Sequence, residues 1–226
     1  MQDQGSLSST GRRSGRRLKL PNCRKRLFQL EYKGEGSQNT SETPNVSLRP
    51  DNMDKQELVF VLQDLDNQLS SPCDIVLVGG AAMILHFGAS RATRDIDMIM
   101  LRGDIRELRR AVGVIAKEHG LPEDWMSDAV KGFADILPPD FYHRLVLLSL
   151  PLKYLRLYVL GRAEQVAMKI VALREQDLED LELLLPVMSE AEKRTLVRIM
   201  HYVSTFRPDW AQKIQYFLQE QGWEIA

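Results

Sequence analysis

The chain has 226 residues, enough for one full domain and a small appendage, and 44% of them are hydrophobic. A formal net charge of −1 excludes a general attraction to nucleic acid or to an acidic membrane surface. Two cysteines are too few for a disulfide framework, and the apolar stretches are too short or too interrupted to cross a membrane. We therefore expect a protein of the reducing cytoplasm.

Residues 1–52 differ in composition from the rest of the chain. They contain ten Lys and Arg against five Asp and Glu, so this segment carries about +5 and the remainder about −6. The segment is polar and can bury too little apolar surface to offset the entropy of ordering, which predicts a disordered basic extension. The basic cluster from Arg12 to Arg26 either contacts RNA or another polyanion, or belongs to a solvated and dispensable arm.

The hydrophobic periodicity after residue 52 predicts strands in the first half and helices before, between and after them. In chain order we expect helix 54–69, strand 75–78, helix 81–87, strand 96–101, helix 105–118, strands 144–150 and 153–160, and helices 162–175, 177–185, 189–204 and 208–221. This order is typical of an α/β (α+β) domain with a small mixed sheet and flanking helices. We expect a core over 53–160 and a C-terminal helical region over 161–226.

The first functional feature is the Gly79-Gly80 pair. It follows the wholly apolar run Ile75 to Val78, which suits a strand buried on both faces, and it precedes a short helix that Gly88 would close. Two glycines at this place let the backbone approach a ligand closely and direct the free N–H groups of a helix N-terminus at an anion. The same pattern is also typical of a simple tight turn.

The second feature is Asp95-Ile96-Asp97 at the start of the next strand. Strand alternation places both carboxylates on one face and Ile96 on the other. Two carboxylates so close repel each other unless a positive charge lies between them, and Mg²⁺ prefers such oxygen ligands together with water and nucleotide phosphates. The residues alone also allow a solvated strand end.

The two features together resemble a known family. The stretch VGGAAMILHFGASRATRDIDMIM resembles the core motif of the DNA polymerase β-like nucleotidyltransferase superfamily, and more closely the bacterial branch related to the AbiEii abortive-infection toxins. The resemblance implies a small mixed sheet of the nucleotidyltransferase type. It also implies that the Gly-Gly turn binds a triphosphate and that the Asp-x-Asp pair binds Mg²⁺.

Residues 164–185, EQVAMKIVALREQDLEDLELLL, resemble the downstream signature of the same branch. Its positions fall on Lys169, Arg174, Asp177 and Asp180, and Lys169 and Asp180 would share a face of an uninterrupted helix. The resemblance implies that Lys169 contacts nucleotide phosphates and that one aspartate has a catalytic or orienting role. The residues alone also allow Asp177 to cap the next helix, Asp180 to favour its dipole, and Arg174 to form a surface pair.

The resemblance implies a Mg²⁺-dependent enzyme that moves a nucleoside monophosphate from an NTP to an acceptor hydroxyl, with tRNA or another RNA as acceptor and an antitoxin protein as partner. The implied roles are catalytic for Asp95, Asp97, Lys169 and Asp177, metal-binding for Asp95 and Asp97, and nucleotide-binding for Gly79, Gly80, Thr93, Arg94, Lys169 and Arg174.

One departure from the wider superfamily concerns the third acid. Many members place a third carboxylate on a later strand, but 144–150 and 153–160 contain none, so either Asp177 or Asp180 substitutes or the metal site is incomplete. Two alternatives therefore stand beside the enzyme. The first is a non-catalytic module that binds a nucleotide or a protein, and the second is a small-molecule nucleotidyltransferase of the antibiotic-modifying kind.

Overall fold

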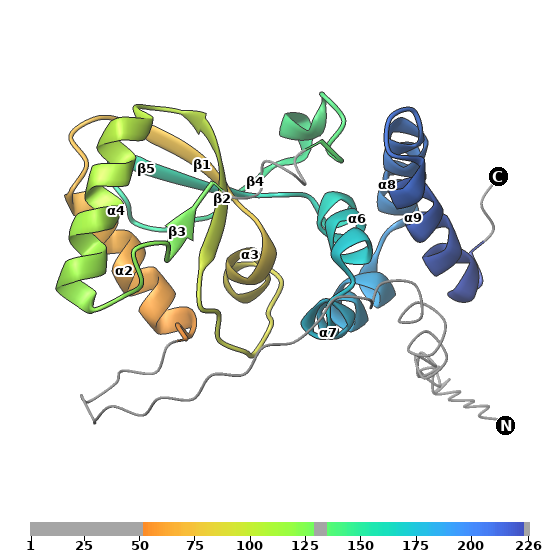
Figure 1. Ribbon diagram of the computed structural model, residues 1–226, viewed down its shortest axis with the longest axis horizontal. Helices are drawn as coiled ribbons and strands as arrows, with labels where there is room; N and C mark the ends of the chain where they lie inside the picture. The colour runs from red at the N-terminus through yellow and green to blue at the C-terminus, as the bar shows by residue number, and fades with distance from the viewer. Residues whose placement is uncertain (1–51, 129–134, 224–226) are drawn as a thin grey trace, which may run out of the picture. The chain divides into compact units, whose positions relative to one another are not determined.

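The computed structural model describes residues 52–128 and 135–223, so the expected basic extension lies outside the described residues apart from residue 52. The helices and strands in these ranges are α2 (Lys55–Asn67), β1 (Cys73–Leu77), α3 (Gly79–Leu85), β2 (Ile96–Arg102), α4 (Ile105–His119), β3 (Met126–Ser127), η2 (Phe141–Arg144), β4 (Val146–Leu147), β5 (Leu155–Val159), α6 (Arg162–Ala172), α7 (Glu175–Leu184), η3 (Leu185–Val187), α8 (Glu190–Ser204) and α9 (Pro208–Glu220) (Figure 1). The mixed α/β fold class is confirmed.

The sheet has five strands in the order β3-β2-β1-β5-β4. Central β1 pairs antiparallel with β2 and parallel with β5, while β3 runs parallel to β2 and β4 antiparallel to β5. Every residue of β1 is buried, as the apolar run predicts. Because β2 runs antiparallel, its first residues lie beside the end of β1, and the Val78 N–H donates to the Asp97 carbonyl at 3.0 Å.

Hydrogen bonds between neighbouring residues fix the start of the first helix, α2. The Asp54 carboxylate accepts from the backbone N–H groups of Gln56 and Glu57 at 2.8 and 2.9 Å, and the Glu57 carboxylate accepts from the Asp54 N–H at 2.9 Å. This reciprocal pair is a capping box. The sequence-based prediction that Asp54 begins this helix is confirmed.

A buried carboxylate joins α2 to β5. The carboxylate of Asp66 accepts the backbone N–H groups of Lys153, Tyr154 and Leu155 at 2.7, 2.8 and 2.6 Å. One hydrophobic cluster then continues from Met53 to Leu218 and includes residues on both sides of residue 160. The division of core and helical region at that residue stays a prediction. In the described ranges no helix is both long and apolar enough to cross a membrane.

Some elements differ from the prediction. The expected strand 144–150 is reduced to the two residues of β4, because the chain before it forms η2 and Arg144 is held there by the carboxylates of Asp140 and Glu164. Strand β3 was not predicted, since two paired residues leave no periodicity. Helix α3 begins two residues early, at Gly79, and its C-cap is His86 rather than Gly88.

Candidate functional site

Gly79 joins β1 to α3 with a φ of +59°, a left-handed conformation that glycine adopts without the steric cost of a Cβ atom. A Cβ built on Gly79 would lie 3.3 Å from Asp97 Oδ2. The absence of a side chain therefore lets the backbone pass directly beside the carboxylate of Asp97. The sequence predicts a close approach of this backbone to a ligand, and that contact stays a prediction.

Gly80 leaves space for a different side chain, that of Thr93. A Cβ there would lie 2.6 Å from Thr93 Oγ1, so Gly80 provides the space into which the Thr93 side chain packs. Thr93 is buried, and its hydroxyl donates to the Asp95 carbonyl at 3.1 Å. Its backbone forms a two-way hydrogen-bonded bridge with Met53. These contacts fix the segment that leads to Asp95.

A cavity of about 350 Å³ opens beside the two aspartates, within the usual size range of small-molecule sites. It is lined by Val78, Gly79, Asp95, Asp97, Gln165, Met168, Lys169, Ala172, Arg174 and Asp177. The cavity thus brings together six of the nine predicted site residues, and the other three are Gly80, Thr93 and Arg94. Those three do not line it, and their nucleotide contacts stay predictions.

The two carboxylates at the start of β2 carry negative charge that their surroundings do not fully balance. The pKa of Asp97 is raised, first by burial and then by the charge of Asp95, while Arg174 and Lys169 offset part of the rise. The pKa of Arg174 is also raised, first by its hydrogen bond with Asp177 and further by the charges of Asp97 and Asp95. Arg174 is therefore close enough to interact with both carboxylates across the cavity.

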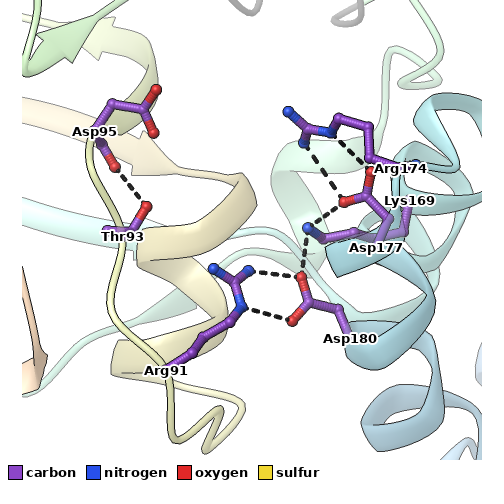
Figure 2. Close-up of polar contacts among 7 residues, drawn as sticks. All are labelled: Arg91, Thr93, Asp95, Lys169, Arg174, Asp177 and Asp180. Atoms are coloured by element: carbon purple, nitrogen blue, oxygen red, sulfur yellow. Dashed lines mark hydrogen bonds and ion pairs between the residues drawn. The ribbon is translucent and has the colours of Figure 1, made fainter. Parts of the chain in front are cut away.

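A row of alternating charges, which we call the ion ladder, begins at the other wall of the cavity. Arg174, Asp177 and Lys169 line the cavity, and Asp180 and Arg91 continue the row beyond its lining (Figure 2). Arg174 Nε lies 2.9 Å from Asp177 Oδ2, and Lys169 Nζ lies 2.7 Å from Asp177 Oδ1 and 2.6 Å from Asp180 Oδ2. At the far end, Arg91 Nη2 lies 2.8 Å from Asp180 Oδ2. The ladder thus connects the segment before Asp95 to α6 and α7.

The ion pairs of the ladder determine which of its members can contact a ligand. Lys169 is only 3% exposed and is held by two carboxylates, so a phosphate contact would have to share its ammonium group with them. The Arg174 side chain is 60% exposed and is the more accessible cation of the two. Asp177 also accepts the Arg174 backbone N–H at 3.0 Å, but the N-cap of α7 is Arg174 and Asp177 is its third helical residue. Asp177 is therefore not the N-cap that the sequence allows.

The carboxylates that a metal ion could use in this cavity are those of Asp95 and Asp97. Across residues 52–128 and 135–223, no three His, Cys, Asp or Glu side chains gather as a metal-binding group. Asp177 lines the same cavity, but Lys169 and Arg174 already neutralise it. Two adjacent carboxylates with unbalanced charge still fit Mg²⁺, which takes few protein ligands and completes its shell with water and phosphate oxygens.

Sequence reasoning did not select two residues of this site. Arg91 pairs with Asp180 across 89 positions, and such a contact leaves no local pattern. Gln165 lines the cavity and precedes Lys169 by four residues on α6, so helical spacing from Lys169 could have indicated it.

Comparison with known proteins gives one family and one solved structure. A family model described as "Nucleotidyltransferase of unknown function (DUF6036)" matches residues 56–219. No curated protein matches the chain. Among solved structures, the chain is similar to an antigenic nucleotidyltransferase-like protein from Paracoccidioides brasiliensis, with 16% identity over 73% of this chain and 94% of that chain and a TM-score of 0.40.

Proposed function

Because the chain belongs to the family of nucleotidyltransferases of unknown function whose model it matches, we propose that it transfers a nucleoside monophosphate from an NTP to an acceptor hydroxyl. One observation carries the proposal: a single cavity sets Asp95 and Asp97 opposite Arg174 and Lys169. Nucleotidyl transfer needs this combination of oxygen ligands for a metal ion and cations for a polyphosphate.

Asp95 and Asp97 would hold Mg²⁺. The pKa of Asp97 is raised first by burial and then by the charge of Asp95, and a divalent cation between the two carboxylates would favour their ionised forms. When bound, the ion neutralises phosphate charge and stabilises the charge that develops during transfer. Arg174, accessible and oriented by Asp177, would contact the polyphosphate, and Gly79 lets the ligand approach the backbone. Lys169 would contribute mainly by fixing Asp177.

The reaction joins the acceptor oxygen to the α-phosphorus of the NTP. The bond between that phosphorus and the oxygen bridging to the β-phosphorus breaks, pyrophosphate leaves, and the hydroxyl proton passes to water. We propose an RNA acceptor, tRNA first, a cytoplasmic reaction and a separate antitoxin partner. These finer points rest on the resemblance of residues 78–100 and 164–185 to the AbiEii-related branch.

A second candidate is a non-catalytic nucleotide-binding module on the same fold. The specific observation in its favour is that Lys169 and Asp177 are both engaged in buried ion pairs. Because Asp177 is already paired, Asp95 and Asp97 are the carboxylates of the cavity that have no ion-pair partner among the described residues. A small-molecule acceptor is a third outcome that the same experiment separates.

The test is label transfer. The protein is incubated with each α-labelled NTP, Mg²⁺ and total tRNA, beside Asp95→Asn/Asp97→Asn and, as matched control, Asp124→Asn, which changes an exposed aspartate outside the cavity lining. We expect labelled RNA with wild type and the control, and none with the double variant. Label in a small molecule instead identifies another acceptor, and Mg²⁺-dependent binding without transfer identifies the binding module. Neither binding nor transfer would overturn the proposal.

A further inference from the structure

Gln165 is a buried polar residue that the fold leaves unsatisfied. It lies in the first turns of α6 and its side chain is fully buried, at 0% exposure. Within the described part of the chain, no group donates to its side-chain oxygen or accepts from its side-chain nitrogen. Burying an amide without partners costs free energy, so an apolar side chain of similar size would serve folding better. An unsatisfied buried group in a folded protein needs an explanation, and a role at a functional site is one such explanation.

The position of Gln165 relates it to the proposed nucleotide site. Gln165, Met168, Lys169 and Ala172 follow three- and four-residue steps, so they share one face of α6, and all four line the cavity. From Gln165 to Ala172 the helix rises by about 10 Å, at roughly 1.5 Å per residue. Along this distance the wall changes from a neutral amide, past Met168, the ion-paired Lys169 and Ala172, towards Arg174 beyond the end of the helix.

This gradient matches the chemistry of a nucleotide. The polyphosphate is anionic and suits the end with Arg174, while the base is flat, neutral and rimmed with hydrogen-bonding atoms. A glutamine amide offers two donors and an acceptor in one plane, which can pair with a donor and an acceptor on a base edge. The thioether of Met168 provides a polarizable surface that packs well against an aromatic ring.

We propose that Gln165 is a specificity-determining residue that hydrogen-bonds to the base of the nucleotide in this cavity. The inference rests on the proposed function and adds to it the group that recognises the neutral end of the substrate. Gln165 should therefore contribute to the binding of a nucleoside triphosphate and contribute nothing to the binding of inorganic triphosphate, which lacks a base.

The test compares Gln165→Met with wild type and with Gln219→Met, which changes an exposed glutamine on α9. Equilibrium binding with Mg²⁺ is measured for the four NTPs and for inorganic triphosphate. We expect Gln165→Met to weaken binding of the preferred NTP by about ten- to a hundred-fold, the worth of a bidentate base contact, and to leave inorganic triphosphate unchanged. Its melting temperature should equal or exceed that of wild type.

Other results overturn the inference. Unchanged NTP affinities for Gln165→Met, or a lowered melting temperature with base preference intact, would assign Gln165 to the fold. A second measurement uses wild type alone. Wild type should bind a purine riboside triphosphate, whose base lacks exocyclic groups, less tightly than it binds the preferred NTP. Equal binding would also refute base recognition. If wild type binds neither NTP nor inorganic triphosphate, the proposed function itself fails.

Discussion

Replacing Lys169 by methionine tests the ion ladder directly. The ammonium group of Lys169 is the shared partner of Asp177 and Asp180, whose side chains are 0% and 1% exposed. Removing one partner of a buried ion pair costs about 3–5 kcal/mol because it leaves a buried charge uncompensated. Arg174 and Arg91 still pair with the two aspartates, so we expect a loss near the lower value, about 3 kcal/mol. For a chain of this size that corresponds to a fall in Tm of roughly 6–12 °C.

The pH dependence of this loss has a defined sign. Burial acts most strongly on the pKa of Asp177 and would raise it, but the hydrogen bond from Arg174 and the charge of Lys169 together lower it. A lowered folded-state pKa stabilises the protein above the unfolded pKa of about 3.9, and this stabilisation disappears as pH falls through the folded pKa. Without Lys169 the pKa of Asp177 rises, so the difference between wild type and variant is largest near neutral pH and shrinks in acid.

The measurement is thermal unfolding by circular dichroism between pH 3 and pH 8. Lys193→Met is the matched control, because Lys193 forms an ion pair with the largely exposed Glu190, and such pairs contribute about 0–1 kcal/mol. A Lys169→Met variant that melts with wild type at pH 7, or one whose deficit grows as pH falls, would refute the role assigned to the ladder.

Three further predictions concern positions that support the site. Asp66→Ala leaves three backbone N–H groups without their acceptor and should lower the free energy of unfolding by about 3–5 kcal/mol in urea titrations. Gly80→Ala places a Cβ 2.6 Å from Thr93 Oγ1 and should cost about 1–3 kcal/mol, whereas Gly113→Ala, with open space around it, should be neutral or stabilising. The pKa of Glu107 should be about 2 by NMR titration, since two serine hydroxyls and a backbone N–H donate to it; its contribution to stability is present above its unfolded pKa and is lost as pH falls towards 2.

Features encoded by neighbouring residues could be predicted. The capping box at Asp54 involves residues three apart, and the buried strand β1 is a continuous apolar run. Asp95 and Asp97 precede and enter β2 as the alternation requires. In each case the decisive chemistry lies within one turn of helix or one short strand, so the sequence pattern contains it.

Contacts between distant segments could not be predicted in the same way. Lys169 and Asp180 would share a face on one uninterrupted helix, whereas the sequence predicts two helices here, and α6 ends at Ala172 with Leu173 at a φ of +46°. The chain then turns and begins α7, and this turn returns Asp180 to Lys169 at 2.6 Å. The two residues therefore lie together for a reason that periodicity does not describe. The side-chain surroundings of Gln165 likewise depend on tertiary packing.

The charges of the cavity lead to a last prediction about the order of binding. Three carboxylates and two cations line it, so with all of them ionised its net charge is negative, and it should repel a metal-free triphosphate. Mg²⁺ should therefore be required for tight NTP binding by wild type. Removing the two negative charges with Asp95→Asn/Asp97→Asn should strengthen metal-free NTP binding while abolishing transfer, as calorimetry with and without EDTA would measure. If the double variant instead bound metal-free NTP more weakly than wild type, the carboxylates would be contacting the nucleotide directly, and their assignment to a metal ion would be wrong.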